Sequence, residues 1–519
     1  MNTLLKATLE SAQSALNPWV QEANTPEPTR LDVRLQATDL RSAAEALRSA
    51  AWGTLSAITG LDQGEQIEVL YHFSAGRLVL TLRVTVPKSD PRLLSLSGLF
   101  PSAELAEREL REMFGVEIEG LTNTDHVFLP DDWRAGDYPL RKDFSYSPQP
   151  LSQAPAEPPG QTFIIPIGPQ HPALKEPEHF RFMVEGEIVK SGTVRLGYAH
   201  RGIEKAAEAR TWTQTLYLME RVCGICSHAH ALGYSLAVEH LAGVEAPPRA
   251  QAIRTLIAEV ERLHSHLLWL GVAAHEAGFD TLFMYSWRDR EQVMDTLEAI
   301  TGNRVNYSAN VLGGVKVDID PSRAEALQRM LTAVEARTHH YLEVVNTDAS
   351  FLRRTRGIGV MSMAQALEAG VVGPTARASG LSWDVRLNAP YAAYERYPLT
   401  VITETNGDLE ARFVVRVREL LASCTLIRAI LDDLPAGDLT ARMPRRIPAG
   451  EAISRIEAPR GELFYFVRSV GSDSPDRVKV RTPTMCNLTS AVALAVGHQL
   501  ADVPMILAGV DPCFSCNDR

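Results

Sequence analysis

The sequence predicts an α+β protein, in which a small N-terminal α/β domain is joined to a mostly α-helical domain built as a long-helix bundle with a short β region. Apolar residues alternate with polar or smaller ones along 78–86, which is typical of a strand half-buried in a sheet. Apolar residues instead recur every three or four positions along 249–274, which indicates a long helix with one wide apolar face. Between these regions, residues 147–161 contain five prolines and few apolar side chains, so we expect a linker there.

Composition and charge exclude several classes of function. The net charge of −11 argues against a broad surface for nucleic acid or anionic lipid. No run of about 18 apolar residues occurs, so no segment is expected to cross a membrane by itself. The N-terminus lacks a signal-peptide core and a twin-arginine pattern. Six cysteines in 519 residues do not make a disulfide framework, which fits a reducing, cytoplasmic compartment.

The N-terminal domain, residues 1–146, is expected to hold a β-hairpin and one clear helix. Residues 67–73 form a strand that pairs with 78–86 through a short turn. Pro101 and Ser102 then begin a helix that Gly115 ends. Taken alone, this domain contains no catalytic motif.

The larger domain, residues 162–519, begins with the short β region and continues as helices. Strands are expected at 163–167 and within 180–196, on either side of a loop at 168–172. Helices are expected at 205–222, 249–274, 322–345 and 410–433. Helices this apolar must bury their faces against one another, so they form the core of a bundle.

Two Cys-x-x-Cys pairs lie at opposite ends of the larger domain: Cys223 with Cys226, and Cys513 with Cys516. Cysteines three positions apart on a turn direct both sulfurs to one point, and four thiolates suit Zn, Fe or Ni better than Mg or Ca. Zinc ribbons usually close over roughly 15–20 residues, whereas 287 positions separate residue 226 from residue 513. We therefore expect a central cofactor, with a structural zinc site as the alternative.

The sequence around both cysteine pairs resembles the metal-binding signatures of nickel-iron hydrogenase large subunits. Three further stretches recur in these hydrogenases and in 49-kDa-type subunits of respiratory complex I, which share the fold but lack the metal cysteines. They are Gly-Pro-Gln-His-Pro at 168–172, Ala-His-Arg-Gly-Ile-Glu-Lys at 199–205 and Ser-Gly-Leu-Ser-Trp-Asp-Val-Arg at 379–386. This resemblance covers 164–519 and implies the nickel-iron hydrogenase large-subunit fold.

The N-terminal domain carries a second resemblance. Residues 107–115, 129–133 and 138–144 are similar to the 30-kDa-type subunit of complex I, whose role is to dock in the peripheral arm. Because the chain keeps all four metal cysteines that the complex I subunits lack, it looks like the catalytic subunit of a complex-I-related, membrane-associated [NiFe]-hydrogenase. The fusion of a 30-kDa-like and a 49-kDa-like part points to its subtype. Among these it is most similar to the formate hydrogenlyase type.

The resemblance implies a Ni–Fe centre with carbon monoxide and cyanide on the iron. It makes Cys223 and Cys513 terminal nickel ligands, and it makes Cys226 and Cys516 bridges between the two metals. Thiolates suit this role because soft, strongly donating ligands stabilise low oxidation states. The two remaining cysteines are expected to be small buried apolar groups instead; they are Cys424 and Cys486.

Three further residues are implied to surround the metals. Arg460, in Glu-Ala-Pro-Arg-Gly at 457–461, would hold its positive charge over the open face of the centre. For this pentapeptide in isolation, a surface arginine would be the better interpretation. Pro483 and Thr484, in Arg-Thr-Pro-Thr at 481–484, would contact the cyanides.

Cleaving H2 leaves a proton, so a carboxylate is expected near the bridging thiolates. Glu176 matches the acid found there in complex-I-related hydrogenases, and Glu178 is its rival two residues on.

Four histidines could also take part in a metal site. His264 and His266 lie near two glutamates, but their leucine neighbours indicate core-edge histidines with satisfied hydrogen bonds. A histidine of the family hydrogen-bonds a bridging sulfur, and its register, at or near His228 or His230, stays open.

The predicted reaction is H2 ⇌ 2H⁺ + 2e⁻, running as H2 evolution in a formate-hydrogenlyase-like complex. No cysteines remain for an iron–sulfur cluster in this chain, so the resemblance implies a cluster-bearing small subunit like the 20-kDa-type subunit of complex I. It also implies membrane antiporter-like subunits, a formate or CO dehydrogenase module and a maturation protease as partners, and no nucleic acid. Through these partners the chain is expected on the cytoplasmic face of the inner membrane.

Two points stay open. The chain ends at Arg519, which matches the cutting site of the family's maturation protease. Many relatives end instead at a histidine that helps to bind Mg, so both the presence of a Mg site and the origin of the Arg519 end, by processing or from the gene, stay open. Besides the zinc protein, the alternative function is a non-catalytic quinone-site or scaffold subunit of a complex I type NADH dehydrogenase, against which the four cysteines argue.

Overall fold

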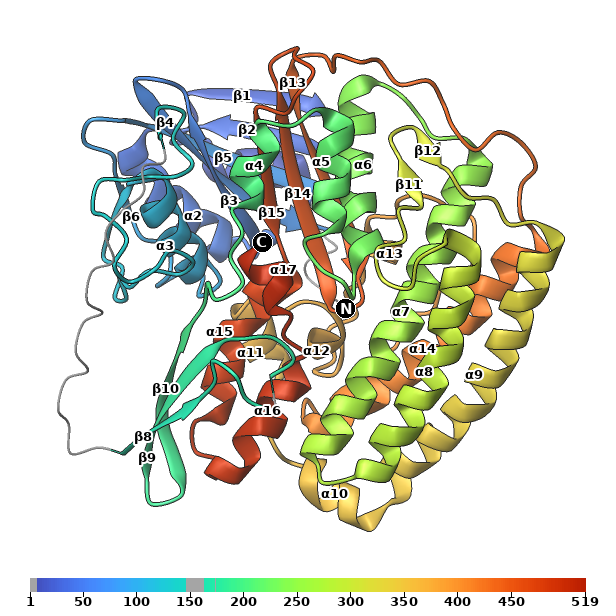
Figure 1. The fold of residues 1–519 in the computed structure, drawn as a ribbon. Coiled ribbons are helices and arrows are strands. Elements are labelled where there is room, and N and C mark those ends of the chain that lie inside the picture. The colour runs from blue at the N-terminus through green and yellow to red at the C-terminus, as the bar shows by residue number, and fades with distance from the viewer. Residues whose placement is uncertain (1–6, 146–162, 173) are drawn as a thin grey trace.

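The computed structural model describes residues 7–145, 163–172 and 174–519, and Figure 1 gives their arrangement. The predicted linker at 147–161 lies outside the described residues. The fold is the predicted α+β type: helices dominate, and the strands form small separate sheets. Among the described residues, no helix combines the length and apolar character that crossing a membrane requires.

The N-terminal part is built on one five-stranded sheet with strand order β1-β2-β5-β4-β3. Strands β2 and β5 run parallel, and the other neighbours are antiparallel. Its elements are α1 Leu9–Leu16, β1 Glu22–Glu27, β2 Arg30–Arg34, α2 Leu40–Ser49, β3 Thr54–Asp62, β4 Gln66–Ala75, β5 Leu78–Pro87, β6 Arg92–Leu94, α3 Ala103–Phe114 and β7 Glu117–Glu119. The predicted hairpin is β4–β5, and the predicted helix is α3, which ends at Gly115 in the left-handed conformation.

The hairpin is more deeply buried than the alternating pattern indicated. Every residue of β4 after Gln66 is buried, so both faces of that strand are covered. The second covering layer comes from the other end of the chain, because Leu70 and Leu61 share a core cluster with Phe464 and Phe466.

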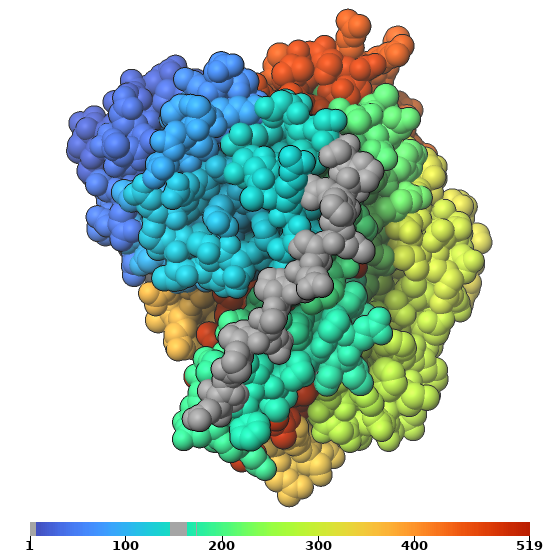
Figure 2. Space-filling view, turned by 60° about the vertical axis from the view of Figure 1, so that its left-hand side comes forward, coloured from blue at the N-terminus to red at the C-terminus, as the bar shows by residue number. Residues whose placement is uncertain are grey.

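The covering layer is a three-stranded antiparallel sheet, β13-β14-β15, which no sequence pattern had predicted. In Figure 1 it stands between the N-terminal sheet and helices α5 and α6. The last elements of the chain are β13 Gly450–Ala458, β14 Gly461–Ser469, β15 Arg477–Arg481, α15 Pro483–Ala495, α16 Val503–Val510 and α17 Phe514–Asp518. Figure 2 likewise shows N-terminal residues, in blue, beside residues from the C-terminal part of the chain, in orange.

A second small sheet opens the larger part of the chain, as predicted. Its strand order is β10-β9-β8, from β8 Phe163–Ile167, β9 His179–Glu185 and β10 Ile188–Arg195. The single helix predicted at 205–222 is wrong, because two helices occupy this stretch: α4 Ile203–Glu208 and α5 Trp212–Glu220. The break lies at Thr211, which caps α5 in a capping box with Gln214.

The bundle contains the three other predicted helices: α7 Pro248–Glu276, α9 Pro321–Thr347 and α14 Leu409–Asp432. Two long helices were missed, α6 Ser227–Ala242 and α8 Asp280–Thr301. The remaining short elements are β11 Asn310–Val311, β12 Gly314–Val315, α10 Ala349–Thr355, α11 Met363–Glu368, α12 Gly373–Arg377 and α13 Val385–Asn388. Short 3₁₀ turns lie at Ala37–Asp39 and Leu500–Asp502. The bundle core includes α7, whereas the buried apolar residues of α6 belong to a separate core cluster that also contains the four cysteines of the Cys-x-x-Cys pairs.

Candidate metal centre

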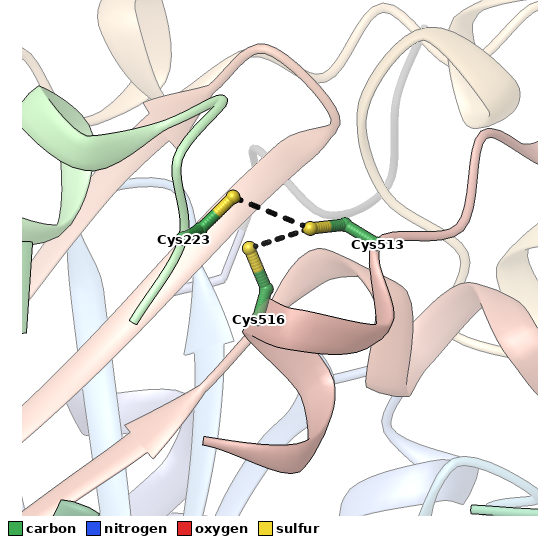
Figure 3. Close-up of side chains that lie close together, drawn as sticks. All are labelled: Cys223, Cys513 and Cys516. Atoms are coloured by element: carbon green, nitrogen blue, oxygen red, sulfur yellow. Dashed lines mark hydrogen bonds between the residues drawn. The ribbon is translucent and has the colours of Figure 1, made fainter. Parts of the chain in front are cut away.

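The two cysteine pairs, 290 positions apart along the chain, meet in the interior. The Sγ atoms of Cys223 and Cys513 are 3.4 Å apart, those of Cys226 and Cys516 are 3.2 Å apart, and those of Cys513 and Cys516 are 3.0 Å apart. Figure 3 shows three of these side chains pointing toward one another: Cys223 from one segment, and Cys513 and Cys516 from the other. A disulfide needs about 2.05 Å between sulfurs, so these are free thiols with room to share metal ions. All four are buried.

Each pair is placed by the start of a helix. Cys226 caps the N-terminus of α6 and Cys513 caps that of α17. The backbone N–H of Ile225 donates to the Cys223 sulfur at 3.2 Å. Free N–H groups and the partial positive charge at the start of the 16-residue α6 favour thiolate.

The buried cluster cannot carry four negative charges by itself. Hydrogen bonds from the other cysteines hold the pKa of the Cys223 thiol well below its usual value. Burial and the neighbouring sulfurs raise the pKa of Cys516 well above its usual value. A bound cation removes this conflict because it allows all four sulfurs to ionise together. The donor set of four thiolates therefore fits soft metals such as nickel and iron.

His230 is the histidine that contacts the cluster. Its Nε2 lies 3.5 Å from the Sγ of Cys516, and its Nδ1 lies 2.8 Å from the hydroxyl of Tyr465. Burial lowers the pKa of His230 to about 4, so the ring is neutral. With Tyr465 donating to Nδ1, the one ring hydrogen is on Nε2 and points at the sulfur. His228 instead contacts the backbone oxygen of Arg254, which resolves the register that the sequence left open.

Arg460 is 3% exposed, so it is not a surface arginine. Its Nε donates to the backbone oxygen of Asp511 at 3.1 Å, and its Nη2 lies 3.1 Å from the Asp511 carboxylate. Its Nη1 donates to the hydroxyl of Ser265 at 3.3 Å. Gly373 makes this placement possible, since a Cβ there would lie 2.3 Å from the backbone oxygen of Arg460.

A small cavity adjoins the cluster. Its lining includes Arg460, Pro483 and Thr484, which were predicted to surround the metals, and the two predicted bridging cysteines. The full lining is Cys226, His230, Ala458, Pro459, Arg460, Leu463, Pro483, Thr484 and Cys516. Pro483 and Thr484 form the first turn of α15, where backbone N–H groups carry partial positive charge. The hydroxyl oxygen of Thr484 also accepts a hydrogen bond from the backbone N–H of Cys513 at 3.0 Å.

Glu176 reaches the cluster through Ser515, which lies between Cys513 and Cys516. The backbone N–H of Ser515 donates to one Glu176 oxygen at 2.7 Å, and its hydroxyl donates to the other. Burial and the Cys513 thiolate raise the pKa of Glu176 to about 7, although the Ser515 hydrogen bonds oppose this. Glu176 also lines an open depression formed by residues 169–172 and 174–177, so it lies between the cysteines and the surface.

Glu178, the rival carboxylate, lies elsewhere. It is fully buried, and no hydrogen bond joins it to the cysteines or to Ser515 in the described part of the chain. Burial and the nearby Asp518 raise its pKa to about 11. Glu178 is therefore a neutral carboxylic acid at ordinary pH.

The discounted side chains stay outside the cluster. His264 Nε2 contacts the backbone oxygen of Ile225 at 3.0 Å, and His266 Nε2 contacts Glu419 at 2.8 Å. Both are deeply buried, so they lie within the core and not at its edge. The pKa values of the thiols of Cys424 and Cys486 are raised by burial, which makes them neutral apolar groups, as expected.

Sequence reasoning missed four residues that shape the site: Asp511, Tyr465, Ser265 and Ser515. Asp511 had a signal, because it belongs to the Asp-Pro-Cys stretch, and it binds both Arg460 and Lys175. Tyr465 and Ser265 had none, since each comes from an element distant in sequence from the cysteines.

Three family models match the chain. The model described as "Respiratory-chain NADH dehydrogenase, 30 Kd subunit" matches residues 33–150. The model described as "Respiratory-chain NADH dehydrogenase, 49 Kd subunit" matches residues 276–447 and 441–519. The model described as "Nickel-dependent hydrogenase" matches residues 201–272, which include the first cysteine pair.

Similar proteins point the same way. Formate hydrogenlyase subunit 5 of Escherichia coli (strain K12) is 35% identical over 506 residues, covering 94% of this chain and 89% of that protein. The carbon monoxide-induced hydrogenase of Rhodospirillum rubrum is 42% identical over 359 residues, covering 69% of this chain and 99% of that protein. An NADH-quinone oxidoreductase subunit of Phocaeicola vulgatus is 34% identical over 495 residues, covering 90% of this chain and 95% of that protein. Because that protein spans both parts of the chain, fusion alone does not separate hydrogenases from complex I subunits.

A solved structure has a similar fold. The chain matches a subunit of the membrane-bound sulfane sulfur reductase, an archaeal respiratory membrane complex, with a TM-score of 0.66 and 33% identity. The match covers 69% of this chain and 98% of that one. Together with the four converging cysteines, these relationships establish that the chain belongs to the family of complex-I-related, membrane-bound nickel-iron hydrogenase large subunits.

Proposed function

We propose that this chain is the catalytic subunit of a [NiFe]-hydrogenase, which interconverts H2 with two protons and two electrons and works as an H2-evolving enzyme in a formate-hydrogenlyase-like complex. The observation that carries this proposal is the convergence of four buried cysteine sulfurs beside a cavity that Arg460 borders. When bound, a nickel–iron centre supplies the heterolytic chemistry of H2. The chain supplies the thiolates, a fixed positive charge and a route for the proton.

Within this proposal, Cys223 and Cys513 hold nickel, and Cys226 and Cys516 hold both metals. The lining of the cavity supports this division, because it includes the second cysteine of each pair and neither of the first. Cys226 and Cys516 would therefore hold the iron beside the cavity. Arg460 and the start of α15, at Pro483 and Thr484, favour negatively charged ligands there, which suits cyanide beside carbon monoxide.

Glu176 moves the proton. With a pKa of about 7, its carboxyl exchanges a proton readily at neutral pH. Ser515 joins it to the segment that carries both C-terminal cysteines, and the depression formed by 169–172 and 174–177 opens toward solvent. Arg460 stays charged because Asp511 and the cysteine thiolates raise its pKa further, so it does not compete as a proton carrier.

Electrons must leave through a partner. Four of the six cysteines belong to the metal site, and Cys424 and Cys486 are each buried apart from it. We infer that a small iron–sulfur subunit receives the electrons, and that antiporter-like membrane subunits and a formate or CO dehydrogenase module complete the complex. The chain would then sit peripherally on the cytoplasmic face of the inner membrane.

We further propose the division into a docking domain at 1–146, a linker at 147–161 and a catalytic domain at 162–519. A second candidate function is the non-catalytic, complex I type subunit, which the similarity to the Phocaeicola vulgatus protein favours. The four thiols weigh against it, because their convergence at one point fits a metal site, which a scaffold does not require.

Metal analysis combined with infrared spectroscopy of the purified, mature complex tests the proposal. A hydrogenase has one nickel per chain and absorption bands from carbon monoxide and cyanide bound to iron. Stoichiometric zinc without these bands would identify a structural zinc protein. Absence of any bound metal would support the complex I type subunit.

A further inference from the structure

A buried cluster of five charged side chains joins the N-terminal part of the chain to the segment that carries the second cysteine pair. Its carboxylates are Glu109, on α3, and Glu204, on α4. Its cations are Arg477 and Lys479, on β15, and Arg519, directly after α17. All five are at most 5% exposed.

Arg519 lies at the centre of this cluster. Its Nη2 is 2.6 Å from Glu109, and its Nε is 2.6 Å from Glu204. Its guanidinium carbon lies 5.0 Å from the centre of the Phe128 ring. Two of these three side chains, Glu109 and Phe128, belong to the N-terminal part, so the guanidinium is held largely from that side.

The two carboxylates are not equivalent. Glu204 is shared with Arg477, at 2.7 Å, and with the backbone N–H of Val480, at 3.1 Å. Glu109 contacts Arg519 and Lys479 alone among the charged groups of the described residues. The cluster holds three cations and two carboxylates. Loss of the Glu109 charge leaves three buried cations and one buried carboxylate, and an uncompensated charge is strongly unfavourable in the interior.

Arg519 connects the charged cluster to α17, the helix that it directly follows. The helix has five residues, too few to be stable without tertiary contacts. Several contacts therefore anchor it. Ser515 binds Glu176, the Asp518 carboxylate accepts from the backbone N–H groups of Gly197 and Ala199, and Arg519 fills the charged cluster. The backbone oxygens of Ser515 and Asp518 also contact Arg201 and His200, and the Phe514 ring is buried in the core. The Nη1 of Arg519 also donates back to the backbone oxygen of Asn517 at 2.6 Å, so the arginine closes the end of the helix.

We propose that Glu109 is a positioning residue of the metal centre, which holds the Cys513–Cys516 segment in place through the Arg519 guanidinium. The N-terminal part of the chain then has a role besides docking, because its Glu109 side chain holds the segment that carries two of the metal-binding cysteines. This inference rests on the proposed function only for its metal readout.

The test is Glu109→Gln in the full chain, with Glu451→Gln as the matched control. Glu451 is also a carboxylate that joins the two parts, because it binds Arg83 and Arg30 of the N-terminal sheet. It lies at the start of β13, whereas Ala458, seven residues on, lines the cavity. At about 3.3 Å per residue, the two ends of this stretch are roughly 23 Å apart.

Hydrogen exchange of the metal-free chain, followed by mass spectrometry, gives the first readout. Peptides covering 511–519 should exchange roughly 10²-fold faster in Glu109→Gln, because a buried ion cluster has lost one partner. Glu451→Gln should leave these peptides unchanged. Arg519→Gln should accelerate exchange at least as much, because it also removes the contact with Glu204. The double variant should be no worse than Arg519→Gln alone, because the Glu109–Arg519 interaction is already lost in that variant.

Nickel content and the infrared bands of the loaded complex give the second readout. In Glu109→Gln, nickel per chain should fall severalfold and the remaining bands should broaden or shift, while Glu451→Gln keeps both. Unchanged exchange at 511–519 in Glu109→Gln and in Arg519→Gln would overturn the inference, even if either variant were less stable overall. A wild-type complex without nickel and without these bands would instead contradict the proposed hydrogenase, leaving the exchange result to stand by itself.

Discussion

Replacing Glu176 by glutamine isolates the proton route. The amide keeps the size of the side chain, and its oxygen can still accept from the backbone N–H of Ser515, a contact of 2.7 Å in the native chain. It cannot take up or release a proton near neutral pH. The four cysteines keep their surroundings, so metal content should stay at the wild-type level.

The pKa of about 7 sets the expected pH dependence. Because this pKa is raised, the carboxyl holds its proton below about pH 7 and loses it above. H2 evolution needs the protonated form as the donor, so the wild-type rate should fall as the pH rises through 7, approaching tenfold per pH unit. H2 oxidation needs the ionised form, so it should fall in the opposite direction. Glutamine should remove both dependences and lower turnover by roughly 10²–10⁴-fold.

Glu178→Gln is the matched control. With a pKa of about 11, this side chain is already neutral at the pH of the assay, so the amide replaces one neutral group by another. Turnover should stay within about threefold of the wild type. The assay is H2 evolution by the membrane complex from pH 5.5 to 9, with nickel measured on the same samples. Near-normal turnover in Glu176→Gln, with full nickel content, would refute the assignment of Glu176 as the proton carrier. A large loss of turnover in Glu178→Gln alone would assign that role to Glu178 instead.

Four shorter predictions follow from the same site. Cys516→Ser should remove both nickel and the infrared bands, because one bridging sulfur serves both metals; retained nickel with wild-type bands would contradict that role. Gly373→Ala, whose Cβ would lie 2.3 Å from the backbone oxygen of Arg460, should lower turnover at least tenfold while the cysteines still bind nickel; unchanged turnover would mean that the guanidinium does not act at the metals. Tyr465→Phe removes the hydroxyl that fixes the ring of His230, so the carbon monoxide band should shift at unchanged nickel content, and an identical band would show that the tautomer is set otherwise. The loaded chain without partners should not reduce a soluble dye with H2 at a useful rate, and rapid dye reduction by the isolated chain would contradict the need for an external cluster.

The sequence predicted the fold class, the β4–β5 hairpin and three bundle helices because each has a strong local period. The predictions of helices failed where the apolar period is weak, or where one apolar stretch contains two helices. The stretch 205–222 is apolar enough for one helix, yet the capping box of Thr211 and Gln214 starts a second one. In α8, the buried side is a narrow stripe that includes Ser286 and Asp289, so its apolar period is faint.

At the site, the four cysteines and Glu176 were identified because their neighbouring residues form recognisable stretches. Tyr465 was not identified, because it reaches the site only through the packing of β14 against α6. Gly233 on α6 makes room for that ring, since a Cβ there would lie 2.9 Å from the Tyr465 Cδ2 atom. A single sequence carries no sign of such a pairing between residues over 200 positions apart.

The sheet β13–β15 also dictates an order of events during folding. The N-terminal sheet is synthesised first, but the face that carries Leu61 and Leu70 is covered only when Phe464 and Phe466 arrive. About 400 further residues must be synthesised before these phenylalanines are available. During that time the apolar face is exposed to water, to other chains or to a chaperone. The strands that cover it are followed within about 50 residues by Cys513 and Cys516. The strands that cover the N-terminal sheet and the last metal ligands are therefore synthesised close together, so a nascent chain cannot acquire a complete metal site before those strands exist.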